Sequence, residues 1–172
     1  MILNNKNKKG FTIIEVIVAC TIISISMFAL MEIAQKGLTL SQFALKKSQA
    51  SLLLEEGVEA VKSIRDNNWA NISSLSLNTT YYLFFNNSTK NWVLNNSNVT
   101  SLNGYIPSYP IDSVFHRNVT INSVNRDIND DIVSSGGTLD PRSKKVDISV
   151  TWNSGGILNS KSISFYIFDI FN

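Results

Sequence analysis

The chain has very few of the residues that most catalytic and metal sites require. Its 172 residues include one cysteine, Cys20, and one histidine, His116. A single cysteine excludes an intramolecular disulfide, and a Cys/His catalytic pair or a zinc cluster would have to be built from these two residues. Cys20 lies in a membrane-like apolar segment, which sets that pairing aside, and the aspartates lack the spacing of a calcium-binding loop. We therefore expect a protein that is not an enzyme and that has no cofactor and no metal.

Charged residues are also scarce. They make up 16% of the chain, against about a quarter in an average soluble protein. Lysine and arginine nearly balance aspartate and glutamate, which leaves a formal net charge of +2. Nucleic-acid binding requires clustered cations, so we predict no nucleic-acid partner. The length suits one domain, or one domain with a membrane anchor.

Residues 11–31 form an almost entirely apolar run that contains neither proline nor glycine. A helix needs about 20 such residues to cross a bilayer, so we predict a transmembrane helix here. The run follows a short basic leader that contains Lys6, Lys8 and Lys9. By the positive-inside rule, we expect these lysines to keep the N-terminus in the cytoplasm and the bulk of the chain to lie outside, on the far side of the membrane.

Glu15 is the one charged residue of this apolar run. A carboxylate inside a membrane is costly and marks a functional position. A secretory signal peptide does not fit, because the residues after the run form a poor cleavage site, and a plain single-pass anchor leaves Glu15 unexplained. Cleavage between Gly10 and Phe11 supplies a partner, because the new α-amine of Phe11 lies four residues from Glu15, about one helical turn.

The sequence KKGFTIIE at residues 8–15, with the apolar run behind it, resembles the class III signal of type IV prepilins and type II secretion pseudopilins. The resemblance implies that prepilin peptidase cuts after Gly10, that the amine of Phe11 is N-methylated, and that Glu15 acts in assembly. The implied partners are other pilin subunits, the prepilin peptidase and methyltransferase, an inner-membrane assembly platform, and membrane lipid before assembly. The processed protein would then lie in an extracellular or periplasmic filament.

After residue 31 the sequence becomes amphipathic. Apolar residues recur at steps of three and four between residues 43 and 64, with charged residues between them, which is typical of a helix with one buried face. Gly37 and Gly57 each weaken such a helix by about 1 kcal/mol relative to alanine. Asp66, Asn67 and Asn68 form a stop signal, so we predict that the transmembrane helix continues to this point.

The second half of the chain predicts antiparallel strands. Segments 81–85 and 92–94 flank a polar turn and indicate a hairpin. Apolar and polar residues then alternate at 115–121, more weakly at 128–133, and again at 146–152 and 163–167, with a turn at 153–156. Such alternation indicates one buried and one solvated face. We interpret His116 and Arg117 as surface positions on one of these strands.

These elements predict an α+β, pilin-like fold in which a long N-terminal helix, transmembrane in its first half, packs on an antiparallel β-sheet head. The expected parts are the leader (1–10), the transmembrane and assembly helix (11–31), the amphipathic helix (32–68) and the head (69–172). The helix end at residues 59–69 and strand segments between residues 114 and 152 are similar to minor pilins. The chain lacks the helix proline and the C-terminal cysteine pair that many major pilins carry, which favours a minor subunit.

Two alternatives stay open. A type II secretion pseudopilin would have the same architecture and the same signal. A single-pass membrane protein that displays a binding domain would need no processing, and its lysine-bearing leader would remain in place.

Overall fold

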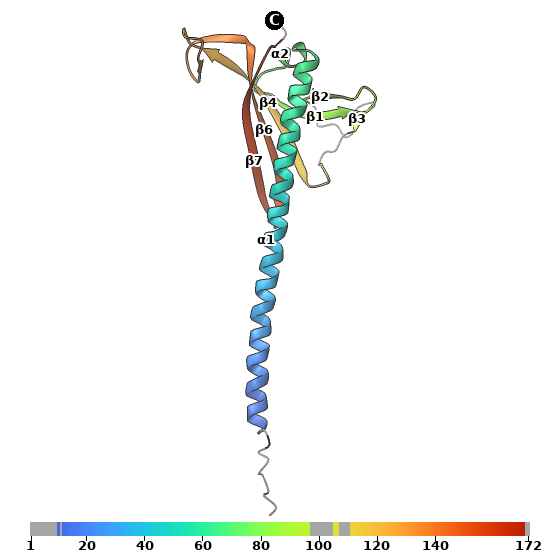
Figure 1. The fold of residues 1–172 in the computed structure, drawn as a ribbon, viewed down its shortest axis with the longest axis vertical. Coiled ribbons are helices and arrows are strands. Elements are labelled where there is room, and N and C mark those ends of the chain that lie inside the picture. The colour runs from blue at the N-terminus through green and yellow to red at the C-terminus, as the bar shows by residue number, and fades with distance from the viewer. Residues whose placement is uncertain (1–9, 11, 97–104, 107–110, 171–172) are drawn as a thin grey trace, which may run out of the picture. The chain divides into compact units, whose positions relative to one another are not determined.

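The computed structural model describes residues 10, 12–96, 105–106 and 111–170. The chain divides into two compact units, Met1–Leu45 and Lys46–Asn172. Helix α1 (Ile13–Asn67) belongs to the first unit up to residue 45 and to the second from residue 46 onward. The predicted helix is therefore present, and it ends within the predicted stop signal (Figure 1).

The second unit is built on an antiparallel sheet of seven strands. The strand order is β2–β1–β4–β6–β7, with β3 paired to β1 and β5 paired to β4. The strands are β1 (Thr80–Asn86), β2 (Asn91–Asn95), β3 (Tyr105–Ile106), β4 (Phe115–Arg126), β5 (Ile132–Val133), β6 (Thr138–Ser154) and β7 (Ile157–Phe168). A short helix, α2 (Ala70–Ser73), precedes β1 in the chain. The predicted α+β class with an antiparallel sheet is confirmed.

Both predicted hairpins are present. Strands β1 and β2 pair around a polar turn, and β6 and β7 pair around a turn of two residues. That second turn consists of Gly155 and Gly156, whose φ angles are 61° and 80°. Positive φ at both central residues matches the twist of a tight hairpin, and glycine adopts it without steric cost.

The predicted strand at residues 128–133 is wrong over most of its length. Only Ile132–Val133 pairs with β4, and Ile128 is fully exposed in the preceding turn. The carboxylate of Asp127 accepts hydrogen bonds from the amides of Asn129 (2.9 Å) and Asp131 (3.0 Å). This local bonding gives the backbone an alternative to the strand ladder, so a turn forms instead.

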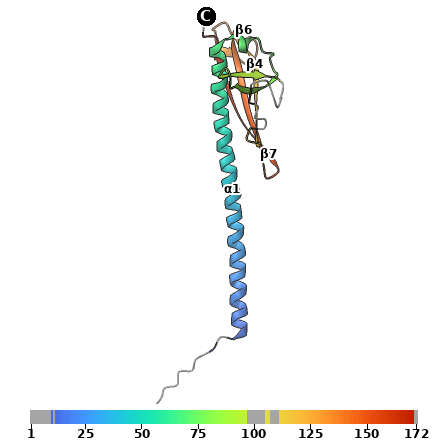
Figure 2. The same ribbon diagram turned by 90° about the vertical axis from the view of Figure 1, so that its right-hand side faces the viewer.

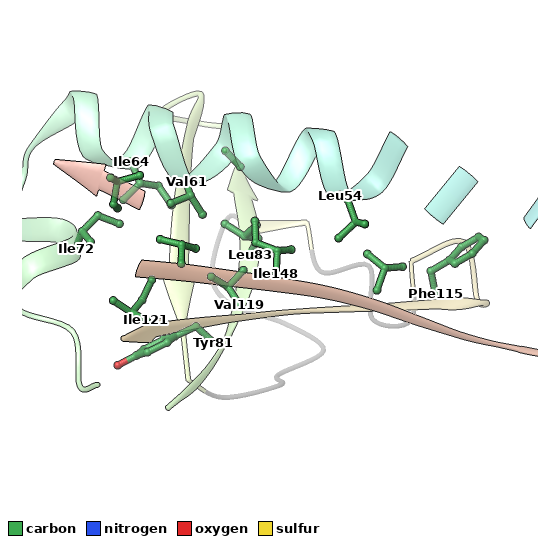
Figure 3. Close-up of a cluster of buried hydrophobic side chains, with 14 of the residues drawn as sticks. Leu54, Val61, Ile64, Ile72, Tyr81, Leu83, Phe115, Val119, Ile121 and Ile148 are labelled. Carbon is green, nitrogen blue, oxygen red and sulfur yellow. The ribbon is translucent and has the colours of Figure 1, made fainter. Parts of the chain in front are cut away.

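The core of the second unit lies between α1 and one face of the sheet. Figure 2 shows the end of α1 running along one side of the strands. In Figure 3, Leu54, Val61 and Ile64 of the helix face side chains of the sheet that include Val119 and Ile148. Val119 and Ile148 are neighbours in the β4–β6 register and are both fully buried. The amphipathic face predicted from the sequence is therefore the face that covers the sheet.

Gly57 allows α1 to approach this sheet closely. A Cβ atom at Gly57 would lie 3.3 Å from the Cδ of Arg117 and 3.3 Å from both Cδ1 and Cγ2 of Ile148. Favourable carbon contacts begin at about 3.5 Å, so these neighbours would have to move. Gly37 differs, because a Cβ there would meet nothing within 4 Å.

The prediction that Arg117 is a surface residue is wrong. Its side chain is 3% exposed, whereas its neighbour His116 is exposed as predicted. The guanidinium donates from Nη1 to the carbonyl oxygen of Leu53 (2.9 Å) and from Nη2 to Oε1 of Glu56 (3.2 Å). The alternation of the strand carries the signal for burial, because Arg117 is in phase with the buried Val119. The charge of Arg117 argued for the surface, and its helix partners could not be read from the strand alone.

Candidate assembly site

The first part of α1 exposes apolar side chains around its whole circumference. Every residue from 12 to 42 is exposed, and the large apolar side chains range from 51% exposed at Val16 to 82% at Ile13. Within the described residues, α1 is the one helix whose length and composition suit a membrane span. A helix that is apolar all round requires lipid or other helices around it. We refer to residues 12–31 as the assembly segment.

The hydroxyl groups of the assembly segment bond within the helix. Thr21 Oγ1 donates to the carbonyl oxygen of Val18, and the hydroxyls of Ser24 and Ser26 donate to the carbonyl oxygens four residues earlier, each at 2.8 Å. In lipid, a polar group without such a partner would cost several kcal/mol. These three residues therefore suit an apolar environment. In the sequence, the signal for this bonding is the position of serine and threonine inside an apolar helix.

Glu15 lies in the first turn of α1. The carbonyl oxygen of Thr12 accepts hydrogen bonds from the amides of Glu15 (3.0 Å) and Val16 (3.3 Å), so helical bonding begins at Thr12. Glu15 is exposed and carries the one formal charge of the assembly segment. A carboxylate at this end also interacts favourably with the helix dipole. Glu15 is thus available to a cation near the start of the helix.

The structure places only two of the predicted site residues. Gly10 is exposed, and nothing lies within 4 Å of the position that a Cβ would occupy there. Phe11, together with Lys6, Lys8 and Lys9, lies outside the described residues. The pairing of the Phe11 amine with Glu15 stays a prediction.

An ion pair follows the assembly segment on α1. Lys36 Nζ lies 2.6 Å from Glu32 Oε1, one helical turn earlier, and both side chains are largely exposed. Charged side chains favour water or lipid headgroups over hydrocarbon. The ion pair is consistent with an apolar segment that ends close to residue 31.

A second polar cluster lies where β4 meets β6, in the second unit. Arg126 Nε donates to Asp140 Oδ2 (2.7 Å), Arg126 Nη1 donates to the carbonyl oxygen of Asp130 (2.7 Å), and the Ser143 hydroxyl also donates to Asp140. Burial opposes the ionisation of Asp140, but the hydrogen bonds from Ser143, Arg126 and the amide of Arg142 outweigh it and lower its pKa to about 2. The described residues contain no group of three or more His, Cys, Asp or Glu placed to hold a metal ion. The hydrogen bonds of this cluster join the end of β4 to the start of β6.

The N-terminal part of the chain matches a known sequence motif. Residues 5–31 match the prokaryotic N-terminal methylation motif, so the chain carries the class III signal of type IV prepilins and pseudopilins. Searches of curated proteins and of solved structures found no match to the chain. The motif supports a filament subunit of the type IV pilin or pseudopilin type, and it points to a structural role rather than an enzymatic one. It implies processing by prepilin peptidase and assembly with other pilin subunits, and with the apolar helix it indicates a single-pass inner-membrane precursor.

Proposed function

We propose that this chain is a minor pilin of a type IV filament. The observation that carries the proposal is the match of residues 5–31 to the methylation motif, followed by a helix that is exposed and apolar on all sides. Such a helix needs lipid before assembly and other helices after it. The precursor waits in the inner membrane with its lysine-bearing leader in the cytoplasm.

The first step is hydrolysis of the peptide bond between Gly10 and Phe11. Water adds across this bond, which leaves a carboxylate on Gly10 and a free amine on Phe11. A methyl group is then transferred to the Phe11 amine from a sulfonium methyl donor, which leaves as a thioether, and the amine loses one proton. The resulting secondary amine is protonated at neutral pH. Loss of the leader also removes Lys6, Lys8 and Lys9, which had held the N-terminus at the cytoplasmic surface.

Glu15 then acts as the partner of the Phe11 ammonium. Both charges are unfavourable in an apolar environment, and each is stabilised when they pair within one chain or between neighbouring subunits. The pair thus favours helices that enter the filament core in one axial register. The unit Lys46–Asn172 supplies the exposed surface of the filament.

A minor subunit is favoured over a major one by two sequence features. The helix has no proline between residues 11 and 67, and the chain has no C-terminal cysteine pair. A type II secretion pseudopilin is the other member of this class that the motif admits. The genes beside this one distinguish the two, since a retraction ATPase indicates a pilus and a secretin with secretion partners indicates a pseudopilus.

The proposal is tested first on the mature N-terminus. Mass spectrometry of the full-length protein from its own host should find a chain that begins at methylated Phe11. Gly10→Leu should retain the leader. An intact Met1 or Lys9 in the unmodified protein would contradict the proposal and favour a membrane-anchored binding domain.

The role of Glu15 is tested separately. Glu15→Leu should leave cleavage intact and lower incorporation into filaments by roughly tenfold or more, the change that about 1.4 kcal/mol of lost pairing energy produces. The matched control is Glu32→Gln, which removes a helix carboxylate that is already paired with Lys36, and it should incorporate normally. Normal incorporation of Glu15→Leu would show that the Glu15 pairing is wrong, whatever the cleavage result.

A further inference from the structure

A groove of about 310 Å³ lies on the second unit, between the end of α1, α2 and β2. Its lining combines one aromatic side chain with amide, hydroxyl and aliphatic groups, and includes Asn67, Asn71, Ser74, Asn91, Trp92 and Leu94. None of the described residues that line it is charged. The residues come from two stretches of the chain, 64–74 and 91–94, and the fold brings these stretches together. We call this the Trp92 groove.

Trp92 is held firmly in this groove. It pairs in register with Phe85 on β1, and the two rings meet edge to face at a centroid distance of 5.1 Å. The guanidinium carbon of the buried Arg117 lies 5.6 Å from the centre of the indole. An aromatic ring fixed in this way loses little conformational freedom when a ligand stacks on it, so more of the contact energy appears as affinity.

The amide groups of the groove are available for a ligand. Asn67, Asn71 and Asn91 are all exposed, and none of the three makes a side-chain hydrogen bond within the part of the chain that the structure describes. Each side-chain amide offers two donors and one acceptor. Three of them beside an indole can therefore bond several hydroxyl groups of one small molecule.

The chemistry of the lining narrows the ligand class. An anionic ligand would find no cation in the groove, and a metal ion would find no carboxylate. A purely apolar ligand would cover the amides and leave them without partners, which is unfavourable. A sugar ring satisfies both parts of the lining, since its C–H face stacks on an aromatic ring and its hydroxyls bond to amides. The volume lies at the lower end for ligand pockets, which suits one ring.

We propose that the Trp92 groove binds a single neutral hexose or N-acetylhexosamine residue of a glycan. The groove lies wholly within the unit Lys46–Asn172. Binding therefore requires neither cleavage of the leader nor assembly, and it can be tested on the unassembled chain.

The test uses the full-length chain in phosphocholine micelles, because sugar-based detergents would compete. Methyl β-galactoside, methyl α-mannoside and N-acetylglucosamine are added separately, with glucuronate as the anionic comparison. Nitrogen–proton NMR spectra follow the Trp92 indole N–H and the side-chain amides of Asn67, Asn71 and Asn91. We expect at least one neutral sugar to shift these signals at millimolar concentration, and glucuronate to shift them less.

Variants then assign the binding to the groove. Asn71→Ala should weaken binding of that sugar about 3- to 10-fold, the effect of one lost hydrogen bond, and Trp92→Leu should abolish it. Asn129→Ala is the matched control, since it removes an exposed asparagine of the turn between β4 and β5 that does not line the groove, and it should bind as the unmodified chain does. If Trp92→Leu fails to fold, Asn71→Ala and Asn91→Ala decide the result.

Three outcomes would overturn the proposal. The first is that none of the neutral sugars shifts the groove signals at tens of millimolar. The second is that a sugar binds with unchanged affinity to Asn71→Ala and Asn91→Ala. The third is that the groove signals shift with protein concentration alone, which would identify a second copy of the chain as the occupant.

Discussion

Arg117 provides a direct test of how α1 is held on the sheet. Its side chain has two separable parts, an aliphatic stem packed beside Gly57 and a guanidinium bonded to Leu53 and Glu56. Arg117→Met keeps most of the stem and removes the charge, whereas Arg117→Ala removes both. Comparing these variants shows whether packing or charge dominates.

The structure sets the expected magnitudes. Arg117→Ala leaves a cavity in a site that is 3% exposed, and such substitutions cost about 2–5 kcal/mol; we expect about 3 kcal/mol. Arg117→Met loses charged hydrogen bonds, but it also removes the cost of burying the guanidinium, which offsets part of that loss. Because Glu56 is 46% exposed, water solvates its carboxylate once the arginine is gone. We expect a loss of about 1 kcal/mol or less for Arg117→Met.

The assay is thermal unfolding of the full chain in micelles, followed by tryptophan fluorescence, since all three tryptophans lie in the second unit. Arg117→Ala should lower Tm by about 10 °C, because 1 kcal/mol shifts Tm by roughly 3–5 °C in a domain of this size. His116→Ala, the exposed neighbour on the opposite face, should change the free energy of unfolding by less than about 0.5 kcal/mol. A loss for Arg117→Met as large as that for Arg117→Ala would refute the packing argument.

Two further predictions concern glycine and pH. Gly57→Leu should destabilise the second unit by about 2 kcal/mol or more, because its side chain would collide with Ile148, whereas Gly37→Leu should preserve or raise helicity by circular dichroism; equal effects would contradict the close approach of α1. The pKa of Asp140 falls from 3.8 to about 2 on folding, so its stabilisation is complete above about pH 4 and is lost as the pH falls towards 2. After allowance for solvent screening, the advantage of the unmodified chain over Asp140→Asn should shrink by about 1 kcal/mol between pH 5 and pH 2 in denaturant titrations. A constant difference would show that the hydrogen bonds from Ser143, Arg126 and the amide of Arg142 do not depress the pKa of Asp140.

Errors in the predicted fold arose where local and tertiary effects competed. The segment from Ile128 to Val133 has strand-forming residues, but the Asp127 carboxylate bonds to the following amides and bends the backbone into a turn. The charge of Arg117 favours a surface position, and only the packed helix shows that the Leu53 carbonyl oxygen and the Glu56 carboxylate accept hydrogen bonds from its guanidinium. Neither partner lies on the strand that carries Arg117.

The two candidate sites also differ in how far the sequence alone predicts them. The signal around Gly10, Phe11 and Glu15 is a pattern of neighbouring residues, so the sequence is enough to recognise it, and residues 5–31 match the prokaryotic N-terminal methylation motif. The roles of the three residues stay predictions. The Trp92 groove could not be foreseen, because its asparagines lie on three different elements, α1, α2 and β2. The spacing of these asparagines in the sequence does not predict that they line the same groove.

The amino-acid sequence by itself determined the features that depend on near neighbours. These are the apolar span, the extent of α1, the hairpin turn at Gly155 and Gly156, and the processing signal, all of which follow from periodicity, run length and backbone freedom. Only the tertiary structure decided that Arg117 is buried and that Gly57 lies against the sheet. It also decided that the side-chain amides of Asn67, Asn71 and Asn91 line one groove. These outcomes depend on how α1 packs on the sheet. The free energy of that packing comes from contacts between residues that are distant in the chain, so the local sequence does not reveal it.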